Sequence, residues 1–288
     1  MDEARLQQLR VGLDALVERY QDPTALDQDP LCVPLAYTDP MDQEVAAWVA
    51  AHLAYGRVAP MLRAIRSALA PLGPHPSVWL RGRSRAQAER RLRTAYQGWV
   101  WRFHTAEDLL QWVLAWRDLD TRTDGQGVQP HLEGPNLDRA LSGLIQELRK
   151  QLPPTPGTRF TLPDPAQGAA CKRWRMHMRW MIRRGWPDLG LWTTLDPAQL
   201  VIPVDTHVAR FAQRLGLTKR KTIDARTAQE ITDSLRKVHP DDPLRYDFAL
   251  AHLGILGDCG IQGPAQSCDT CPLEDVCLCT QSGRMALR

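Results

Sequence analysis

The sequence has no long apolar run. Its longest apolar stretch, from Val45 to Tyr55, is interrupted by His52, and a membrane span needs about 20 apolar residues. The first ten residues, MDEARLQQLR, lack the apolar segment of a secretory signal. We therefore expect no membrane partner and a cytoplasmic location. With 43% hydrophobic and 24% charged residues among 288, the composition is globular and excludes wholesale disorder.

The sequence also lacks internal repeats and convincing strand alternation, so we expect an all-α fold. Apolar residues recur at helical spacing, and two proline-rich connections, 21–40 and 152–170, separate the helical stretches. The expected helices cover residues 2–20, 42–58, 60–72, 84–97, 105–119, 136–151, 171–185, 205–216, 224–238 and 243–257. Helix-start residues support several of them, namely Thr105 with Asp108, Asn136, Asp205, Asp224 and the pair Asp241 and Asp242.

Acidic residues are scarce in three segments. Residues 81–93 hold six arginines and one acid, residues 172–184 hold six basic residues and no acid, and residues 205–226 hold six basic residues and two aspartates. The three segments carry +15 and the rest of the chain −12, so the near-neutral total of +3 hides strongly basic stretches. Such stretches indicate a polyanionic partner, or alternatively solvated helix faces.

Cysteines are sparse except near the C-terminus. Five of the seven lie between Cys259 and Cys279, in the pattern Cys259-x8-Cys268-x2-Cys271-x5-Cys277. Clustered cysteines in a chain that we expect to be intracellular indicate metal ligation rather than disulfides. Four thiolates at these spacings suit zinc or an iron–sulfur cluster, and Cys279 competes with Cys277 for the fourth position.

Two motifs carry a resemblance to a known family. The stretch VDTHVAR at 204–210 and the stretch ALAHLG at 249–254, followed by CDTCPLEDVC at 268–277, resemble the helix-hairpin-helix DNA glycosylase superfamily, in particular endonuclease III and the adenine-DNA glycosylases. Those proteins hold a [4Fe–4S] cluster with C-x6-C-x2-C-x5-C, so the first gap here is two residues longer. The resemblance implies a two-lobed helical fold with a cluster loop. One lobe would cover 31–186 and the other 1–30 with 187–288.

The resemblance also implies a catalytic pair. Asp205 by itself is an ordinary helix N-cap, but the family's aspartate stabilises the cation that forms on the sugar as the base leaves. Lys172 follows Gly168-Ala169-Ala170-Cys171, which resembles the family's G-V-G-R-K hairpin, and would form a Schiff base with the sugar. Alternatively, Lys172 belongs to a basic helix face that contacts phosphate. The 33-residue spacing from Lys172 to Asp205 is similar to that of archaeal 8-oxoguanine glycosylases.

The N-terminal half would supply further DNA contacts. The family has a helix end that reaches into the duplex gap, where this chain has Tyr55-Gly56-Arg57, although a plain helix end with a glycine stop is the alternative reading. The full set of expected DNA-binding residues is Tyr55, Arg57, Gly168, Arg173, Arg175, Arg179, His207, Arg210 and Arg214. Five aromatic residues are expected to build the core of this half, namely Trp99, Trp101, Phe103, Trp112 and Trp116.

Together these features predict a base-excision DNA glycosylase with abasic-site (AP) lyase activity. It would act as a monomer on double-stranded DNA that contains a damaged, oxidised base, in the bacterial nucleoid. The chain is similar to a bacterial branch of the superfamily. Two other classes stay open from the residues alone: a non-catalytic DNA-structure-binding protein that keeps the fold and cluster, and a zinc-stabilised interaction protein.

Overall fold

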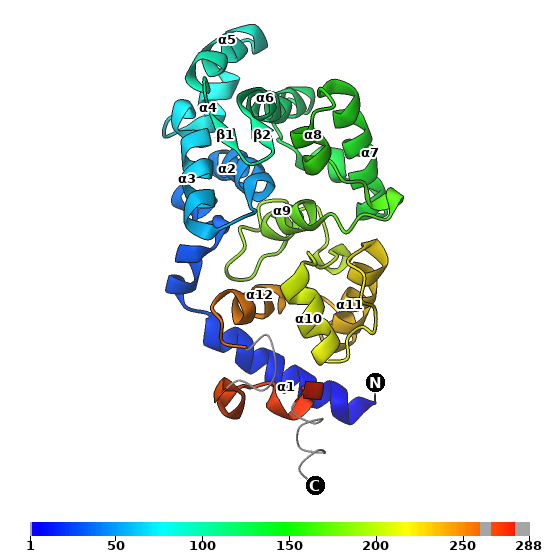
Figure 1. Ribbon diagram of the computed structural model, residues 1–288. Helices are drawn as coiled ribbons and strands as arrows, with labels where there is room; N and C mark the ends of the chain where they lie inside the picture. The colour runs from blue at the N-terminus through cyan, green and yellow to red at the C-terminus, as the bar shows by residue number, and fades with distance from the viewer. Residues whose placement is uncertain (1, 260–265, 280–288) are drawn as a thin grey trace.

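The computed structural model describes residues 2–259 and 266–279, and it is mostly helical (Figure 1). The all-α prediction is therefore confirmed at the level of fold class. The helices are α1 Glu3–Tyr20, α2 Pro40–Leu53, α3 Val58–Leu69, α4 Pro76–Arg81, α5 Arg85–Ala95, α6 Ala106–Arg122, α7 Leu137–Gln151, α8 Pro156–Thr161, α9 Lys172–Ile182, α10 Thr206–Arg214, α11 Ala225–Val238 and α12 Asp247–Ile255. Among the residues described, no helix is long and apolar enough to cross a membrane.

Side-chain caps set most of the helix starts that the sequence predicted. Thr105 and Asp108 form a reciprocal capping box at α6, and Asn136 caps α7. Asp224 caps α11 through the backbone N–H of Thr227. Each cap satisfies an amide that the first helical turn leaves without a partner. The predicted cap at Asp242 is wrong, because α12 begins only at Asp247 and the Asp242 carboxylate instead pairs with Arg183.

A short β-hairpin interrupts the helices and was not predicted. Strand β1, Val100–Trp101, pairs antiparallel with β2, His104–Thr105. Two residues per strand give no alternation that a sequence pattern could reveal. The hairpin lies beside α8 (Figure 1), where the His104 ring is within hydrogen-bond distance of the Thr161 hydroxyl, at 2.7 Å.

Helix α9 crosses the middle of the molecule and joins its two halves (Figure 1). On one side it packs against α2, within the half built from α2 to α8. The other half holds α10, α11 and α12 together with α1, which packs against α11, α12 and the short 3-10 helix η9, Glu274–Val276. The N-terminal helix therefore lies beside segments more than 200 residues away in the sequence.

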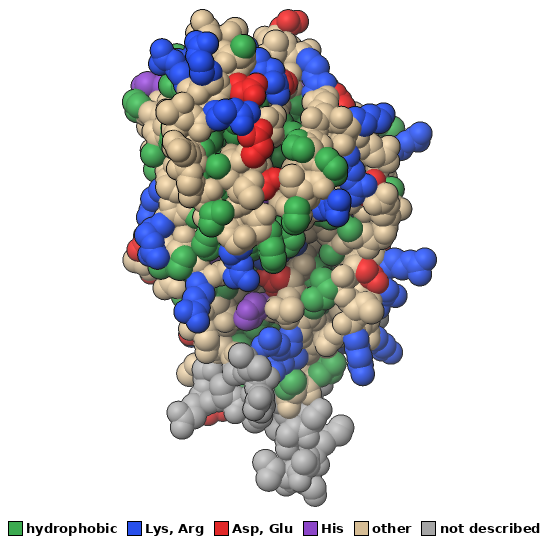
Figure 2. Space-filling model, turned by 45° about the horizontal axis from the view of Figure 1, so that its top comes forward, with side chains coloured by type: hydrophobic (Ala, Val, Ile, Leu, Met, Phe, Trp, Pro, Cys, Tyr) green, Lys and Arg blue, Asp and Glu red, His purple; other side chains and the backbone are tan. Residues whose placement is uncertain are grey.

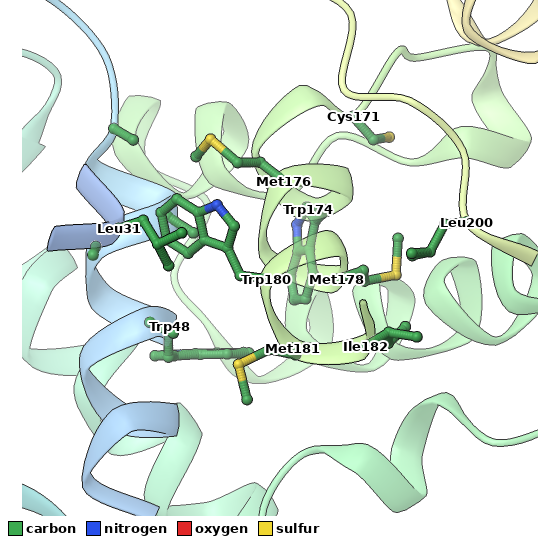
Figure 3. Close-up of a cluster of buried hydrophobic side chains, with 14 of the residues drawn as sticks. Leu31, Trp48, Cys171, Trp174, Met176, Met178, Trp180, Met181, Ile182 and Leu200 are labelled. Carbon is green, nitrogen blue, oxygen red and sulfur yellow. The ribbon is translucent and has the colours of Figure 1, made fainter. Parts of the chain in front are cut away.

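The apolar face of α9 forms the centre of the core. Trp174, Met178 and Met181 are fully buried (Figure 3). The ring of Trp48 on α2 stacks on that of Trp112 on α6, with centroids 4.2 Å apart. This contact ties α2 and α6 to each other, and aromatic pairs of this kind add to the free energy gained from burial.

Two basic residues of α9, Arg175 and Arg179, are buried as well. This corrects the prediction that they bind DNA. Arg175 and Arg179 are 1% and 4% exposed. Arg175 forms two hydrogen bonds with Asp138, at 2.9 and 3.0 Å, and Arg179 pairs with Asp188 and Asp247. These guanidinium groups do not lie on the surface, because acidic residues from other elements neutralise them inside the protein.

The aromatic residues of the first half divide between core and surface. Trp112 and Trp116 are buried as predicted. Trp99 and Trp101 are only partly buried, and Phe103 is 49% exposed. The prediction that Phe103 belongs to the core is therefore wrong, because the unpredicted hairpin places it at a turn.

Candidate active site at the junction of α9 and α10

Lys172 and Asp205 meet where the two halves join. Lys172 is the first residue of α9, and Asp205 is the cap that precedes α10. The Lys172 Nζ and the Asp205 Oδ2 are 3.0 Å apart. Both side chains are partly exposed, at 40% and 26%, so the pair can meet a ligand from solvent. The fold thus joins two residues that lie 33 positions apart in the sequence.

The two oxygens of the Asp205 carboxylate make different contacts. Its Oδ1 accepts hydrogen bonds from the backbone N–H groups of His207 and Val208, each 2.9 Å long, while Oδ2 faces Lys172. Burial alone would raise the pKa of Asp205. The Lys172 ammonium and the backbone N–H of Val208 outweigh burial and hold that pKa below its usual value. Asp205 is therefore a fixed anion at a helix start, where the helix dipole favours negative charge.

A cavity of about 440 Å³ opens at this pair. Its walls come from residues 28–30, the α2–α3 turn at 54–58, and helices α9, α10 and α12. This volume lies within the range of small-ligand pockets, about 300–1,000 Å³. We name it the junction cavity, because both halves of the molecule contribute to its wall.

Three side chains in the wall of the junction cavity have polar atoms without a hydrogen-bond partner among the described residues. They are Asp247 Oδ1, His207 Nδ1 and Arg173 Nε. Burial raises the pKa of Asp247 to about 6, although Arg179 opposes this shift. Burial also lowers the pKa of Arg173 to about 10. Buried polar groups are normally paired, so these three atoms are exceptions within the wall of the junction cavity.

Sequence reasoning missed Asp247, and it had little signal to find it. Asp247 begins a strongly apolar helix, where an aspartate is unremarkable as a first-turn residue. Only its place in the junction cavity, next to Arg179, makes it notable. The sequence did point to Tyr55, Arg173 and His207, which all line the same cavity.

Four other predicted DNA contacts lie outside the cavity wall. Arg57 is exposed at the start of α3. Gly168 is exposed with a left-handed φ of +84°, and its carbonyl accepts from the backbone N–H of Ala225. Arg210 is partly exposed on α10. Arg214 contacts the cysteine cluster instead, since its Nη1 lies 2.9 Å from the Cys259 Sγ.

The three basic segments differ in how many of their Lys and Arg side chains are buried or held in ion pairs. In segment 81–93, Arg81, Arg85 and Arg93 pair with acidic residues of α6. Segment 172–184 is largely buried, as described above. Segment 205–226 keeps several charges without an ion pair among the described residues, namely Arg210, Lys219, Lys221 and Arg226. Figure 2 shows one face, where hydrophobic side chains gather across the middle and Lys and Arg side chains lie around them.

The clustered cysteines line a second, small cavity of about 30 Å³. Cys259, Cys268, Cys271, Cys277 and Cys279 all contribute to it, and none forms a disulfide within the described chain. Their donor type and shared cavity fit a thiolate-bound metal centre. Over residues 2–259 and 266–279, however, no three potential ligands are held at metal-binding separations. The choice between Cys277 and Cys279 stays open.

Comparison with known proteins gives one family. Residues 29–256 match the family described as "Protein of unknown function (DUF2400)". The chain belongs to this family. The matched region includes Lys172, Asp205 and the whole wall of the junction cavity except Gln28, and it ends before the cysteine cluster. No curated protein and no solved structure matches the chain.

Proposed function

We propose that the protein is a DNA glycosylase with AP lyase activity, which removes a damaged base that has been turned out of the duplex into the junction cavity. The observation that supports this proposal most is the 3.0 Å contact between the Lys172 amine and the Asp205 carboxylate in the wall of that cavity. An amine beside a fixed carboxylate supplies both a nucleophile and an anionic group that stabilises a sugar cation.

In the first step, the bond between the sugar C1′ and the base breaks, and the base leaves with the electron pair and takes up a proton. Asp205 stabilises the positive charge that develops on the sugar. The ammonium of Lys172 gives up this proton to the departing base, and its neutral Nζ forms a bond to C1′ while Asp205 stays ionised. Asp205 suits this role because its Oδ1 stays anchored by two backbone N–H groups while Oδ2 faces the amine.

In the second step, the sugar ring opens to a Schiff base between Lys172 and C1′. Loss of a proton from C2′ then breaks the bond from C3′ to its oxygen, which leaves as a phosphate ester. Hydrolysis of the Schiff base returns free Lys172. The Lys172 side chain is 40% exposed, which leaves room for the sugar and for the water that this last step needs.

The proposed partner is duplex DNA, which would contact exposed basic residues. Arg57 at the start of α3, Arg210 on α10 and the lysines at 219 and 221 make no ion pair with described residues. They can therefore neutralise phosphates without first breaking a bond within the protein. Cys259, Cys268, Cys271 and Cys277 would hold a [4Fe–4S] cluster, or less favourably zinc, as a brace for the C-terminal segment.

Borohydride trapping tests this proposal directly. The full-length protein is incubated with oligonucleotides that carry an abasic site or one lesion from a panel of oxidised bases, and borohydride reduces any Schiff base to a stable adduct. We expect an adduct with the native protein and none with Lys172→Ala. Lys150→Ala serves as the matched control, because Lys150 is exposed on α7 and should leave the adduct unchanged.

Asp205→Asn separates chemistry from folding. Asparagine is an equally good N-cap, so we expect the melting temperature to stay close to that of the native protein. We expect base excision to slow by about 100-fold, in line with the loss of one electrostatic stabiliser. An adduct that survives Lys172→Ala would overturn the lyase assignment. Selective DNA binding without any adduct or strand scission would instead assign the chain to DNA-structure binding alone.

A further inference from the structure

The clustered cysteines supply one thiol more than a four-ligand metal centre needs. Cys259, Cys268, Cys271, Cys277 and Cys279 line the same small cavity, and all five are partly buried. An all-cysteine zinc site takes four thiolates, and so does a [4Fe–4S] cluster. One of the five thiols is therefore left over when such a centre is complete.

Three of the thiols lie on backbone that other contacts hold in place. The backbone N–H of Cys259 donates to the Leu253 carbonyl in α12, at 3.2 Å, and its Sγ lies 2.9 Å from the Arg214 Nη1. Cys268 and Cys271 belong to one turn, in which the backbone N–H of Cys271 donates to the Cys268 carbonyl at 3.0 Å. Cys259 is thus tied to α10 and α12, and the other two share a short turn.

Helix α1 anchors the segment that follows this turn. The bare Gly12 lets the helix approach the Pro272 carbonyl, to which an added Cβ would come within 2.6 Å. Arg5 donates to the Val276 carbonyl at 3.1 Å, and the Val276 side chain is buried. These contacts hold the chain directly before Cys277.

Cys277 and Cys279 lie together after this anchored segment. They are two residues apart in the sequence, and their thiols are in hydrogen-bonding contact with each other. Both also line the cavity that the other three cysteines share, which measures only about 30 Å³. Each of the two thiols is therefore close to the same three partners.

Adjacent thiols of this kind can exchange places on a metal. A bound ligand is a thiolate, so the incoming thiol loses its proton as it binds, and the outgoing thiolate takes up a proton as it leaves. One metal–sulfur bond forms for each that breaks, and the charge of the centre stays the same. The exchange therefore needs neither an oxidant nor a reductant.

We propose that the cysteine segment holds one metal centre whose fourth ligand is interchangeable. Cys259, Cys268 and Cys271 are its constant ligands, and either Cys277 or Cys279 completes the set. This inference rests on the metal centre of the proposed function and deepens it, but it does not depend on the DNA chemistry. The spare thiol keeps the centre intact when its neighbour is oxidised or alkylated, which are the reactions that exposed thiols undergo.

Metal analysis of cysteine variants tests the exchange. Iron, zinc and acid-labile sulfide are measured per chain in the full-length protein, purified without oxygen. We expect Cys277→Ala and Cys279→Ala each to keep the native metal content and the double variant to lose it. Cys271→Ala removes a constant ligand and should lose the metal as a single substitution. Cys32→Ala is the matched control, because Cys32 lies outside the cavity lined by the cluster, and should keep it.

Alkylation of the native protein gives a second measurement, which needs no variant to fold. The protein is treated with iodoacetamide under conditions that retain its metal, and intact mass and peptide mapping show which thiols react. We expect alkylation at Cys277 in some chains and at Cys279 in others, but never at both in one chain. Once one of the two is alkylated, the other is bound to metal and protected.

Each possible result decides between the alternatives. Metal loss from Cys277→Ala or Cys279→Ala alone would overturn the exchange, and so would a double variant that keeps its metal. Alkylation of both thiols in one chain, or of only one of the two in all chains, would also contradict it. A native protein without metal would remove the metal centre and this inference together. None of these measurements uses DNA, so absence of borohydride adducts would overturn the proposed chemistry alone.

Discussion

At the scale of single residues, His177 is an unfavourable polar group of the interior. It lies on α9 and is fully buried, and neither ring nitrogen has a hydrogen-bond partner among the described residues. Its ring packs edge-on against Trp192, with centroids 5.2 Å apart. Burial lowers the pKa of His177 to about 3. The folded protein therefore keeps this imidazole neutral where the unfolded chain would already be protonated.

His177→Phe is expected to stabilise the protein, and more so at acid pH. The unfolded imidazole titrates near pH 6.5, so the native protein loses stability as the pH falls from about 6.5 towards 3. Between pH 7.5 and pH 5 this loss amounts to about 2 kcal/mol, and phenylalanine removes it. Urea denaturation of both proteins at the two pH values measures the difference. Parallel pH profiles would show that His177 does not contribute.

At the scale of elements, α9 joins the halves of the molecule through a row of ion pairs. Lys172 pairs with Asp205, Arg175 with Asp138, and Arg179 with both Asp188 and Asp247. The acidic partners come from four other parts of the chain. The helix that begins with the proposed nucleophile is thus fixed in position by charges on separate elements.

Arg179→Met is expected to destabilise the protein by about 3–5 kcal/mol, because it takes the cation from buried Asp247 and leaves buried Asp188 with Arg183 alone. Arg90→Met is the matched control, since Arg90 is exposed on α5. It should change the free energy of unfolding by no more than about 0.5 kcal/mol. Chemical denaturation measures both variants. Equal stability of the two would mean that Asp188 and Asp247 do not depend on Arg179.

Helix α1 supports the cysteine segment through a close backbone contact. A Cβ added at Gly12 would lie 2.6 Å from the carbonyl oxygen of Pro272. Arg5, also on α1, donates to the carbonyls of Leu215 and Val276. This helix therefore contacts the segment that holds Cys271 and Cys277 directly.

Gly12→Ala is expected to displace the cysteine segment and to destabilise the protein by about 1–3 kcal/mol, as overpacking does. Gly143→Ala in α7 is the matched control, because no atom lies within 4 Å of its added Cβ. That substitution should stabilise by about 0.5–1 kcal/mol through helix propensity. Thermal denaturation and the rate of cysteine alkylation measure the two effects. Similar behaviour of both variants would contradict the contact at Pro272.

At the scale of the whole molecule, the net charge of +3 does not indicate which residues would bind DNA. Three of the six arginines of segment 81–93 pair with acidic residues of α6, and Arg175 and Arg179 on α9 are buried. In segment 205–226, Arg210 is partly exposed and makes no ion pair with described residues. Binding to duplex DNA should therefore depend on which basic residues lie unpaired at the surface and not on the net charge.

Arg210→Ala is expected to weaken binding to undamaged duplex DNA and to reduce the slope of log K against log salt by about 1, as the loss of one phosphate contact does. Arg85→Ala is the control, because Arg85 already pairs with Asp118 and Glu89. It should leave the slope unchanged. Fluorescence anisotropy over a series of salt concentrations measures the slopes. An equal reduction of the slope in both variants would show that the effect of Arg210→Ala comes from the loss of any one charge, and not from a phosphate contact of Arg210.

Local patterns in the sequence predict the helical framework. The helix starts at Thr105, Asn136 and Asp224 were all predicted from such patterns. Caps and apolar periodicity act within one or two helical turns, so neighbouring residues suffice to predict them.

Which partner a side chain contacts, and whether it is buried, depends on how the helices pack together. Arg175 and Arg179 have the same spacing as a solvated basic face, yet distant carboxylates bury them. Phe103 looks like a core residue, yet a two-residue turn exposes it. The junction of Lys172, Asp205 and Asp247 likewise depends on three helices meeting. The reason is physical: periodicity states which residues share a face, but the partner that covers this face lies elsewhere in the chain.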